Sequence, residues 1–276
     1  MISKIYRVWK TEGVNGLFVR LGNRFGVVYS LLQNFGKSEV VSSYGVLMSK
    51  NWLDATFRFC ITGAYGNFFF NYLEKQTELF VFLDIGANQG LYTLIANKNP
   101  NCTKVIAFEP VSSTFSLLEQ NIRINDAVEK CFTVKKGLGE QANSLTIRIP
   151  KNHSGAATIS AHLNDASTKC LEETIEIVSS DYLNELEISE TENIIVKIDV
   201  EAQEESVLKA LAESLIFEKI QALFYEINEV WVDPKKLEDF LIGRGFKYFQ
   251  KIGSGKHYDV FASRTSRESS THNFNV

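Results

Sequence analysis

The segment FVFLDIGANQG, residues 80–90, places five apolar residues among six positions directly before two glycines and an asparagine. A short apolar run that ends in a glycine-rich turn is typical of a buried parallel strand leading into a nucleotide-binding loop. The segment therefore predicts an α/β domain with a nucleotide site at the carboxyl end of a strand. The candidate ligands are a dinucleotide, a phosphate and the adenosyl group of S-adenosylmethionine.

The pattern between residues 80 and 262 alternates short apolar runs with amphipathic segments. Candidate strands are residues 80–84, 104–109, 131–135, 194–199, 220–226, 246–250 and 257–262. Candidate helices include residues 91–97, residues 112–125 with Ser112 or Ser113 as N-cap, and residues 204–213 with acids in the first turn. This alternation predicts a doubly wound, mostly parallel seven-stranded sheet of the α/β class.

The last two candidate strands break the alternation. They are joined only by KIGSG, which is too short for a crossover helix and has the right length for a hairpin. A parallel sheet that ends in an antiparallel hairpin is the Rossmann-like architecture of class I methyltransferases rather than that of dehydrogenases. The expected fold is therefore that of a class I methyltransferase.

The turn itself also departs from the dinucleotide fingerprint. In GxGxxG the second glycine lets the backbone approach a pyrophosphate, whereas here Ala87 and Asn88 follow Gly86, and the next glycine is Gly90. We expect Gly86, Ala87, Asn88 and Gly90 to shape a cofactor site that does not take a pyrophosphate. An NAD-dependent dehydrogenase is correspondingly disfavoured.

Two carboxylates at strand ends favour S-adenosylmethionine instead. Asp84 closes the first strand, where we expect it to face the ligand and suit its ammonium and sulfonium charges. Glu109 closes the second strand, where an acidic side chain can accept hydrogen bonds from both ribose hydroxyls. The combination of a strand-end Asp, a glycine turn and a second-strand Glu predicts an S-adenosylmethionine site.

Three blocks of the sequence resemble a known family. DIGANQG, IAFEP followed by NIRIN, and VKIDVEAQEESVLKAL are similar to the FkbM-type methyltransferases, and the resemblance covers about residues 54–262. It implies S-adenosylmethionine as cofactor and methylation of a hydroxyl oxygen on a sugar, a glycan or another natural product. EIVSSDYLNEL resembles the family segment with a Leu-Asp pair, which carries Asp181 over as a cofactor-binding residue.

One block departs from the family pattern. Where the family has Glu-Gly-Ala-Glu, this chain has Glu201-Ala202-Gln203-Glu204. Because a glycine is lost at the turn, we expect either a negative φ at Ala202 or a different local geometry.

Methyl transfer needs an acceptor held in line with an electrophilic methyl group and help in removing the acceptor's proton. The predicted catalytic residues lie at the carboxyl ends of strands: Asp199, with Lys197 on the same strand face as its ion-pair partner, then Glu201 and Glu226. His153, in a polar loop or hairpin after the third strand, is a further candidate base. The sequence contains no tight Asp/His cluster, so no metal site is predicted.

Composition restricts the partners of the chain. A net charge of −4 over 276 residues provides no general attraction for nucleic acid, so the predicted partner is a small-molecule or glycan acceptor. The four cysteines are far apart and indicate neither a zinc site nor a disulfide framework. The chain has no apolar run of the roughly 20 residues that cross a bilayer, and its N-terminus lacks a signal-peptide core. The predicted location is the cytoplasm.

The ends of the chain differ from its middle. Residues 1–50 are predicted to form a basic, helical N-terminal extension, because their first half carries five basic residues against one acidic residue. This extension either packs on the methyltransferase domain, residues 51–263, or makes a weak peripheral contact with a membrane surface. Residues 264–276 are polar and predict a disordered tail. The functional alternative to an enzyme is a non-catalytic binding or scaffold module that retains the methyltransferase fold.

Overall fold

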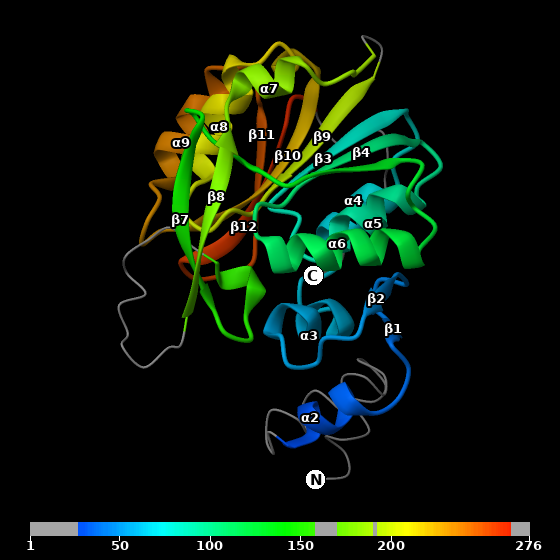
Figure 1. Ribbon diagram of the computed structural model, residues 1–276. Helices are drawn as coiled ribbons and strands as arrows, with labels where there is room; N and C mark the ends of the chain where they lie inside the picture. Colours follow the sequence, from blue (N-terminus) through cyan, green and yellow to red (C-terminus); the bar gives the residue numbers. More distant parts are fainter. Residues whose placement is uncertain (1–26, 158–169, 190–191, 266–276) are drawn as a thin grey trace.

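A central sheet covered by helices on both faces forms the body of the protein (Figure 1). The computed structural model describes residues 27–157, 170–189 and 192–265. The expectations for the basic residues 1–25 and for most of the C-terminal tail lie outside this range. Within it, no helix combines the length and the apolar character that crossing a bilayer requires.

The sheet has seven strands in the order β11-β12-β10-β9-β3-β4-β5. Their bounds are β3 (Phe80–Ile85), β4 (Cys102–Phe108), β5 (Cys131–Val134), β9 (Asn193–Ile198), β10 (Ile220–Asn228), β11 (Tyr248–Ile252) and β12 (His257–Ser263). The five neighbouring strands β10, β9, β3, β4 and β5 pair in parallel. Strand β12 pairs antiparallel with both β10 and β11. The predicted fold class is confirmed, including the antiparallel hairpin at the end of the sheet.

Helices on both faces explain why the strands are apolar almost throughout. Successive residues of the central strands, such as Phe82 and Leu83 of β3, enter different core clusters on the two faces of the sheet. Figure 1 shows α4 (Phe68–Glu74), α5 (Leu91–Lys98) and α6 (Ser112–Ile124) on one face of the sheet, with α8 (Glu204–Glu213) and α9 (Pro234–Ile242) on the other. The three helices predicted between strands are therefore present at the expected places.

The start of α6 differs from the prediction. The N-cap residue is Val111, and neither Ser112 nor Ser113 caps the helix with its side chain. Instead the backbone N–H of Ser112 donates to Glu173 Oε1 at 2.9 Å, and its hydroxyl donates to the same oxygen. Glu173 lies on β8 (Cys170–Val178). A tertiary contact with another strand thus replaces the local cap that the sequence suggested.

A second, smaller sheet follows β5. It contains β6 (Gly137–Leu138), β7 (Asn143–Pro150) and β8, and β7 pairs antiparallel with β8. Its apolar residues Ile147, Ile175 and Ile177 pack with Val111 in a cluster of their own. This sheet stands beside the carboxyl edge of the main sheet and carries the segment around His153, which the sequence placed in a loop or hairpin.

The segment before residue 50 contains α2 (Val27–Asn34) and a short hairpin of β1 (Glu39–Val41) and β2 (Leu47–Ser49). The hairpin packs on α6, where Asn121 and Asn125 accept hydrogen bonds from the backbone N–H groups of Ser49 and Leu47 at 2.7 and 2.9 Å. Met48 is fully buried in the same core. The boundary near residue 50 stays a prediction, but residues 39–49 share the core of the larger unit.

Candidate active site

The glycine turn after β3 is built against the end of β9. Gly86 has a φ of +76°, and a Cβ atom there would lie 1.9 Å from the carbonyl oxygen of Asp199. The backbone N–H of Asp199 in turn donates to Ile85 O at 3.1 Å. Because the two strand ends touch through their backbones, only glycine fits at this position.

A buried lysine joins the two strand ends. Lys197 Nζ donates to Gly86 O at 2.6 Å and lies 3.6 Å from Asp84 Oδ1 and 3.4 Å from Asp199 Oδ2. Burial lowers the pKa of Lys197, but the carboxylates of Asp199 and Asp84 outweigh it and the net shift is upward. The predicted pair of Lys197 with Asp199 is confirmed, and Lys197 is a fixed cation beneath the turn.

Asp84 lies away from the cavity, whereas the sequence led us to expect that it would face the ligand. Its side chain is fully buried, its Oδ2 accepts a hydrogen bond from Thr93 at 2.7 Å, and it does not line the cavity. The reason is that Lys197 on the adjacent strand draws the carboxylate inward. Asp84 therefore holds Lys197 in place beneath the turn and does not reach the cavity.

Glu109 lies at the cavity wall after β4, as predicted. Its carboxylate accepts hydrogen bonds from the backbone N–H groups of Asn88 and Val111, both at 2.9 Å. Burial raises the pKa of Glu109 to about 7, and those two hydrogen bonds oppose the shift. The side chain is thus held in one orientation by the turn that it faces, with further lone pairs available to a ligand's hydroxyl groups.

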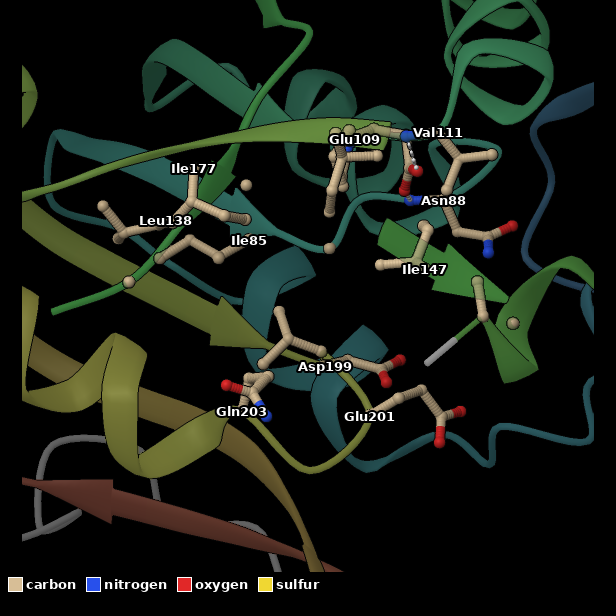
Figure 2. Close-up of a pocket in the computed structure, with 18 of the residues that line it drawn as sticks. Ile85, Asn88, Glu109, Val111, Leu138, Ile147, Ile177, Asp199, Glu201 and Gln203 are labelled. Carbon is tan, nitrogen blue, oxygen red and sulfur yellow. Dashed lines mark hydrogen bonds between the residues drawn. The ribbon is translucent and has the colours of Figure 1, made fainter. Parts of the chain in front are cut away.

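One cavity of about 510 Å³ connects the turn with the ends of β9 and β10. Figure 2 shows Asn88 and Glu109 at one side, Asp199 and Glu201 at the other, and apolar side chains between them. The apolar wall includes Ile85, Val111, Leu138, Ile147 and Ile177. A volume of this size, with both apolar and polar residues in its wall, is typical of a small-molecule site.

Of the other predicted cofactor residues, two shape the turn without lining the cavity. Ala87 donates its N–H to Phe108 O at 2.9 Å, and Gly90 precedes α5 with a φ of +86°. Asp181 is misplaced by the sequence reasoning, because it is exposed on α7 (Ser180–Asn184) and lies outside the cavity. Figure 1 shows α7 at the end of the sheet opposite α3 (Ala55–Thr62), which contributes to the cavity.

The candidate catalytic carboxylates come together at the carboxyl edge. Ile198 pairs with Tyr225, so Asp199 and Glu226 are level on neighbouring parallel strands. One carboxylate oxygen each from Asp199, Glu201 and Glu226 lies within 4.8 Å of the others. A search of the sequence for an Asp/His cluster does not reveal this group of three carboxylates, because the ends of two strands form it and it contains no histidine. Acidic groups commonly gather in this way without an ion, and the absence of a metal stays a prediction.

Burial and the neighbouring charges raise the pKa values of two of these carboxyl groups. Burial first, then the charges of Asp199 and Glu226, raises the pKa of Glu201 to about 8. Burial and Asp199 likewise raise the pKa of Glu226 to about 7, although His257 opposes this shift. Glu201 is consequently protonated at neutral pH and offers a hydrogen-bond donor there rather than a base.

His153 lines the cavity on the side of the turn. Its ring packs edge-on against Phe59 with centroids 6.0 Å apart, and burial lowers its pKa. The next residue, Ser154, contacts Asn88 Oδ1 at 3.1 Å and donates its N–H to Asp54 Oδ2 at 2.8 Å. His153 thus belongs to a short segment that packs against the turn.

Sequence reasoning missed His257, which lines the same cavity. Its Nε2 lies 2.6 Å from Glu226 Oε1. The only signal in the sequence is that His257 begins the last strand of a predicted hairpin. The register that brings it to Glu226 depends on how β12 pairs with β10.

The turn after β9 keeps a left-handed backbone. Glu201 has a φ of 51° and Ala202 a φ of 76°, so of the two alternatives stated for this turn, a negative φ at Ala202 is wrong. An L-residue in this region costs about 1–2 kcal/mol relative to glycine.

We therefore expect Ala202→Gly to raise the free energy of unfolding by about 1 kcal/mol, measured by urea denaturation. Ala212→Gly, inside α8, is the matched control and should lower it by about 1 kcal/mol. A loss of stability at position 202 as large as that at position 212 would contradict backbone strain in this turn.

Comparison with known proteins places the chain among methyltransferases. The family model described as "Methyltransferase FkbM domain" matches residues 84–248. "Methyltransferase 1" of Beauveria bassiana (strain ARSEF 2860) is 28% identical over 144 residues, which are 47% of this chain and 57% of that protein. "Hexuronic acid methyltransferase AglP" of Haloferax volcanii is 29% identical over 192 residues, 62% of this chain and 73% of that protein. The chain thus spans little more than half the length of the first of these relatives.

Among solved structures, the METTL16 MTase domain covers 94% of this chain and 95% of its own, with 13% sequence identity and a TM-score of 0.48. TrmK of M. capricolum, in complex with S-adenosyl-homocysteine, covers 71% of this chain and 68% of its own, with 11% identity and a TM-score of 0.43.

Proposed function

Because this chain belongs to the FkbM methyltransferase family, we propose that it transfers a methyl group from S-adenosylmethionine to a hydroxyl oxygen of a sugar, glycan or other natural product. The observation that carries the proposal is that one continuous cavity joins the Gly86 turn and Glu109 to the carboxylates of Asp199 and Glu201. One end of it suits a nucleoside, and the other end suits a hydroxyl-bearing acceptor.

The residues present fit the cofactor of this family. Glu109 offers carboxylate oxygens to ribose hydroxyls, and the apolar side chains of Val111, Leu138 and Ile177 suit a flat adenine ring. The carboxylate-rich edge beyond Asp199 suits the positive charges of the donor. When bound, S-adenosylmethionine supplies an electrophilic methyl group on a cationic sulfur.

Asp199 has the position of an acceptor-orienting group. Lys197 fixes one of its oxygens at 3.4 Å, while 36% of its side chain stays exposed at the cavity. A carboxylate held in this way accepts a hydrogen bond from an alcohol and orients its oxygen. The relative named as a hexuronic acid methyltransferase supports a sugar as the acceptor.

The ribose assignment predicts a specific loss. Glu109→Ala should weaken S-adenosylmethionine binding by about 1–3 kcal/mol, because the ribose hydroxyls and two backbone N–H groups lose their acceptor. Isothermal calorimetry measures the change. Glu119→Ala, on the exposed side of α6, is the control and should bind as the wild type does. A folded Glu109→Ala protein with unchanged affinity would remove the assignment.

The function is tested with labelled S-adenosylmethionine and an extract from the protein's own source. Transfer of label, followed by mass spectrometry of the product, should place the methyl group on oxygen. Methylation of nitrogen would contradict the acceptor class. Tight cofactor binding without any transfer would instead favour a binding module, and binding of NAD in place of S-adenosylmethionine would overturn the proposal.

A further inference from the structure

His257 and Glu226 form a hydrogen-bonded pair at the acceptor end of the cavity. His257 begins β12 and pairs with Asn228, while Glu226 lies two residues earlier on β10 and pairs with Asp259. Residues two apart on a strand point to the same face of the sheet, so His257 and Glu226 are diagonal neighbours. The 2.6 Å contact between Nε2 and Oε1 follows from this register.

The two partners differ in exposure. The Glu226 side chain is 24% exposed and that of His257 is 59% exposed, so the carboxylate is the inner member and the imidazole the outer one. Both line the cavity together with Asp199. With Nε2 engaged by Glu226, the other ring nitrogen, Nδ1, makes no hydrogen bond to any residue that the structure describes. A carboxylate that holds one imidazole nitrogen leaves the other as a proton acceptor.

The neighbouring acids are less suited to take a proton. Asp199 is engaged by the ammonium of Lys197 at 3.4 Å. Glu201, whose pKa burial raises to about 8, is protonated at neutral pH. Asp259 faces Glu226 across the strand pair but does not line the cavity.

We infer that His257 is the general base of the reaction and that Glu226 is its positioning residue. This inference rests on the proposed methyl transfer to a hydroxyl group. As the acceptor oxygen bonds to the methyl carbon, the carbon–sulfur bond breaks and its electron pair stays on sulfur. The hydroxyl proton passes to Nδ1 of His257, the charge of Glu226 stabilises the imidazolium, and the exposed ring then releases the proton to water.

His257→Gln is the sharpest test, because a glutamine amide nitrogen can keep the contact with Glu226 but cannot accept the proton. Label transfer from S-adenosylmethionine to a source extract should fall by about 10²-fold or more, with cofactor affinity and thermal stability unchanged. Lys256→Gln, at the adjacent exposed position outside the cavity, should transfer label as the wild type does. Equal transfer by His257→Gln and the wild type would overturn the inference.

A pH profile separates a positioning role of Glu226 from a structural one. The wild-type rate should rise along an acidic limb as the base loses its proton, and this limb should be absent in His257→Gln. In Glu226→Gln the rate should fall about tenfold and the limb should move to lower pH, because a neutral amide no longer stabilises the protonated ring.

The groups that also face the pair are Asp199, Glu201, Glu204, Asp259 and Lys197, and they are unchanged in both variants. An acidic limb that persists unchanged in His257→Gln would assign the titration to one of these groups and overturn the inference. A wild type that transfers no label would instead contradict the proposed function itself.

Discussion

Gly86→Ala is expected to lower the free energy of unfolding by at least about 3 kcal/mol and to remove S-adenosylmethionine binding. The added Cβ would lie 1.9 Å from Asp199 O, which is backbone rather than a flexible side chain. Separating the two strand ends would break two hydrogen bonds, because Asp199 N–H donates to Ile85 O and Lys197 Nζ donates to Gly86 O. Urea denaturation measures the first effect, and calorimetry on the folded protein measures the second.

Gly255→Ala isolates the backbone contribution to that loss. Gly255 has a φ of +80°, close to the +76° of Gly86, but a Cβ there would meet no atom within 4 Å. Its substitution should cost about 1 kcal/mol, the penalty of a left-handed L-residue alone. If both variants lost the same amount of stability, the close contact between the β3 turn and the end of β9 would not be rigid.

The main sheet could be predicted because its strands are buried on both faces. Residues 80–85 are all buried, so the strand is nearly all apolar and visible without any knowledge of its neighbours. In β7 and β8, by contrast, exposed and buried positions mix and charged residues are frequent. These strands were not among the candidate strands, since their apolar face covers only a small cluster around Ile147 and Ile177.

The site was predictable where it depends on strand periodicity and not where it depends on packing. Lys197 and Asp199 share a face because they are two residues apart, and their pairing followed from that alone. The direction of Asp84 depends on a lysine of another strand, which the sequence of β3 does not contain. His257 needs the register of β10 with β12. Asp181 was assigned by similarity alone, and it lies on the exposed side of the short helix α7.

Asp199→Asn is expected to reduce turnover by about 10²-fold while leaving cofactor affinity nearly unchanged. Asparagine has the shape of aspartate but lacks the charge that would orient an acceptor hydroxyl. The fold should persist, because Lys197 remains paired with Asp84 at 3.6 Å and bonded to Gly86 O. Label transfer from S-adenosylmethionine measures turnover, and calorimetry measures affinity. Equal turnover of the variant and the wild type would exclude Asp199 from the reaction.

Asp199→Asn should also change the pH dependence of stability, which can be measured without knowing the methyl acceptor. In the folded wild type the pKa of Glu201 is raised to about 8. Between the ordinary pKa of glutamate and pH 8, Glu201 therefore carries a proton in the folded protein but not in the unfolded chain. Stability should therefore fall as pH rises through this window. The charge of Asp199 is a cause of the shifts at both Glu201 and Glu226, and its removal should bring both pKa values down.

We therefore expect the free energy of unfolding of Asp199→Asn to fall less steeply between pH 5 and pH 8, an interval of about three pH units, than that of the wild type. Urea denaturation at a series of pH values gives both slopes. Asp181→Asn, an exposed change outside the cavity, is the control and should keep the wild-type slope. A slope unchanged by Asp199→Asn would mean that the three carboxylates do not interact as their spacing of 4.8 Å or less implies, and the acidic edge would then lose its role in binding the acceptor.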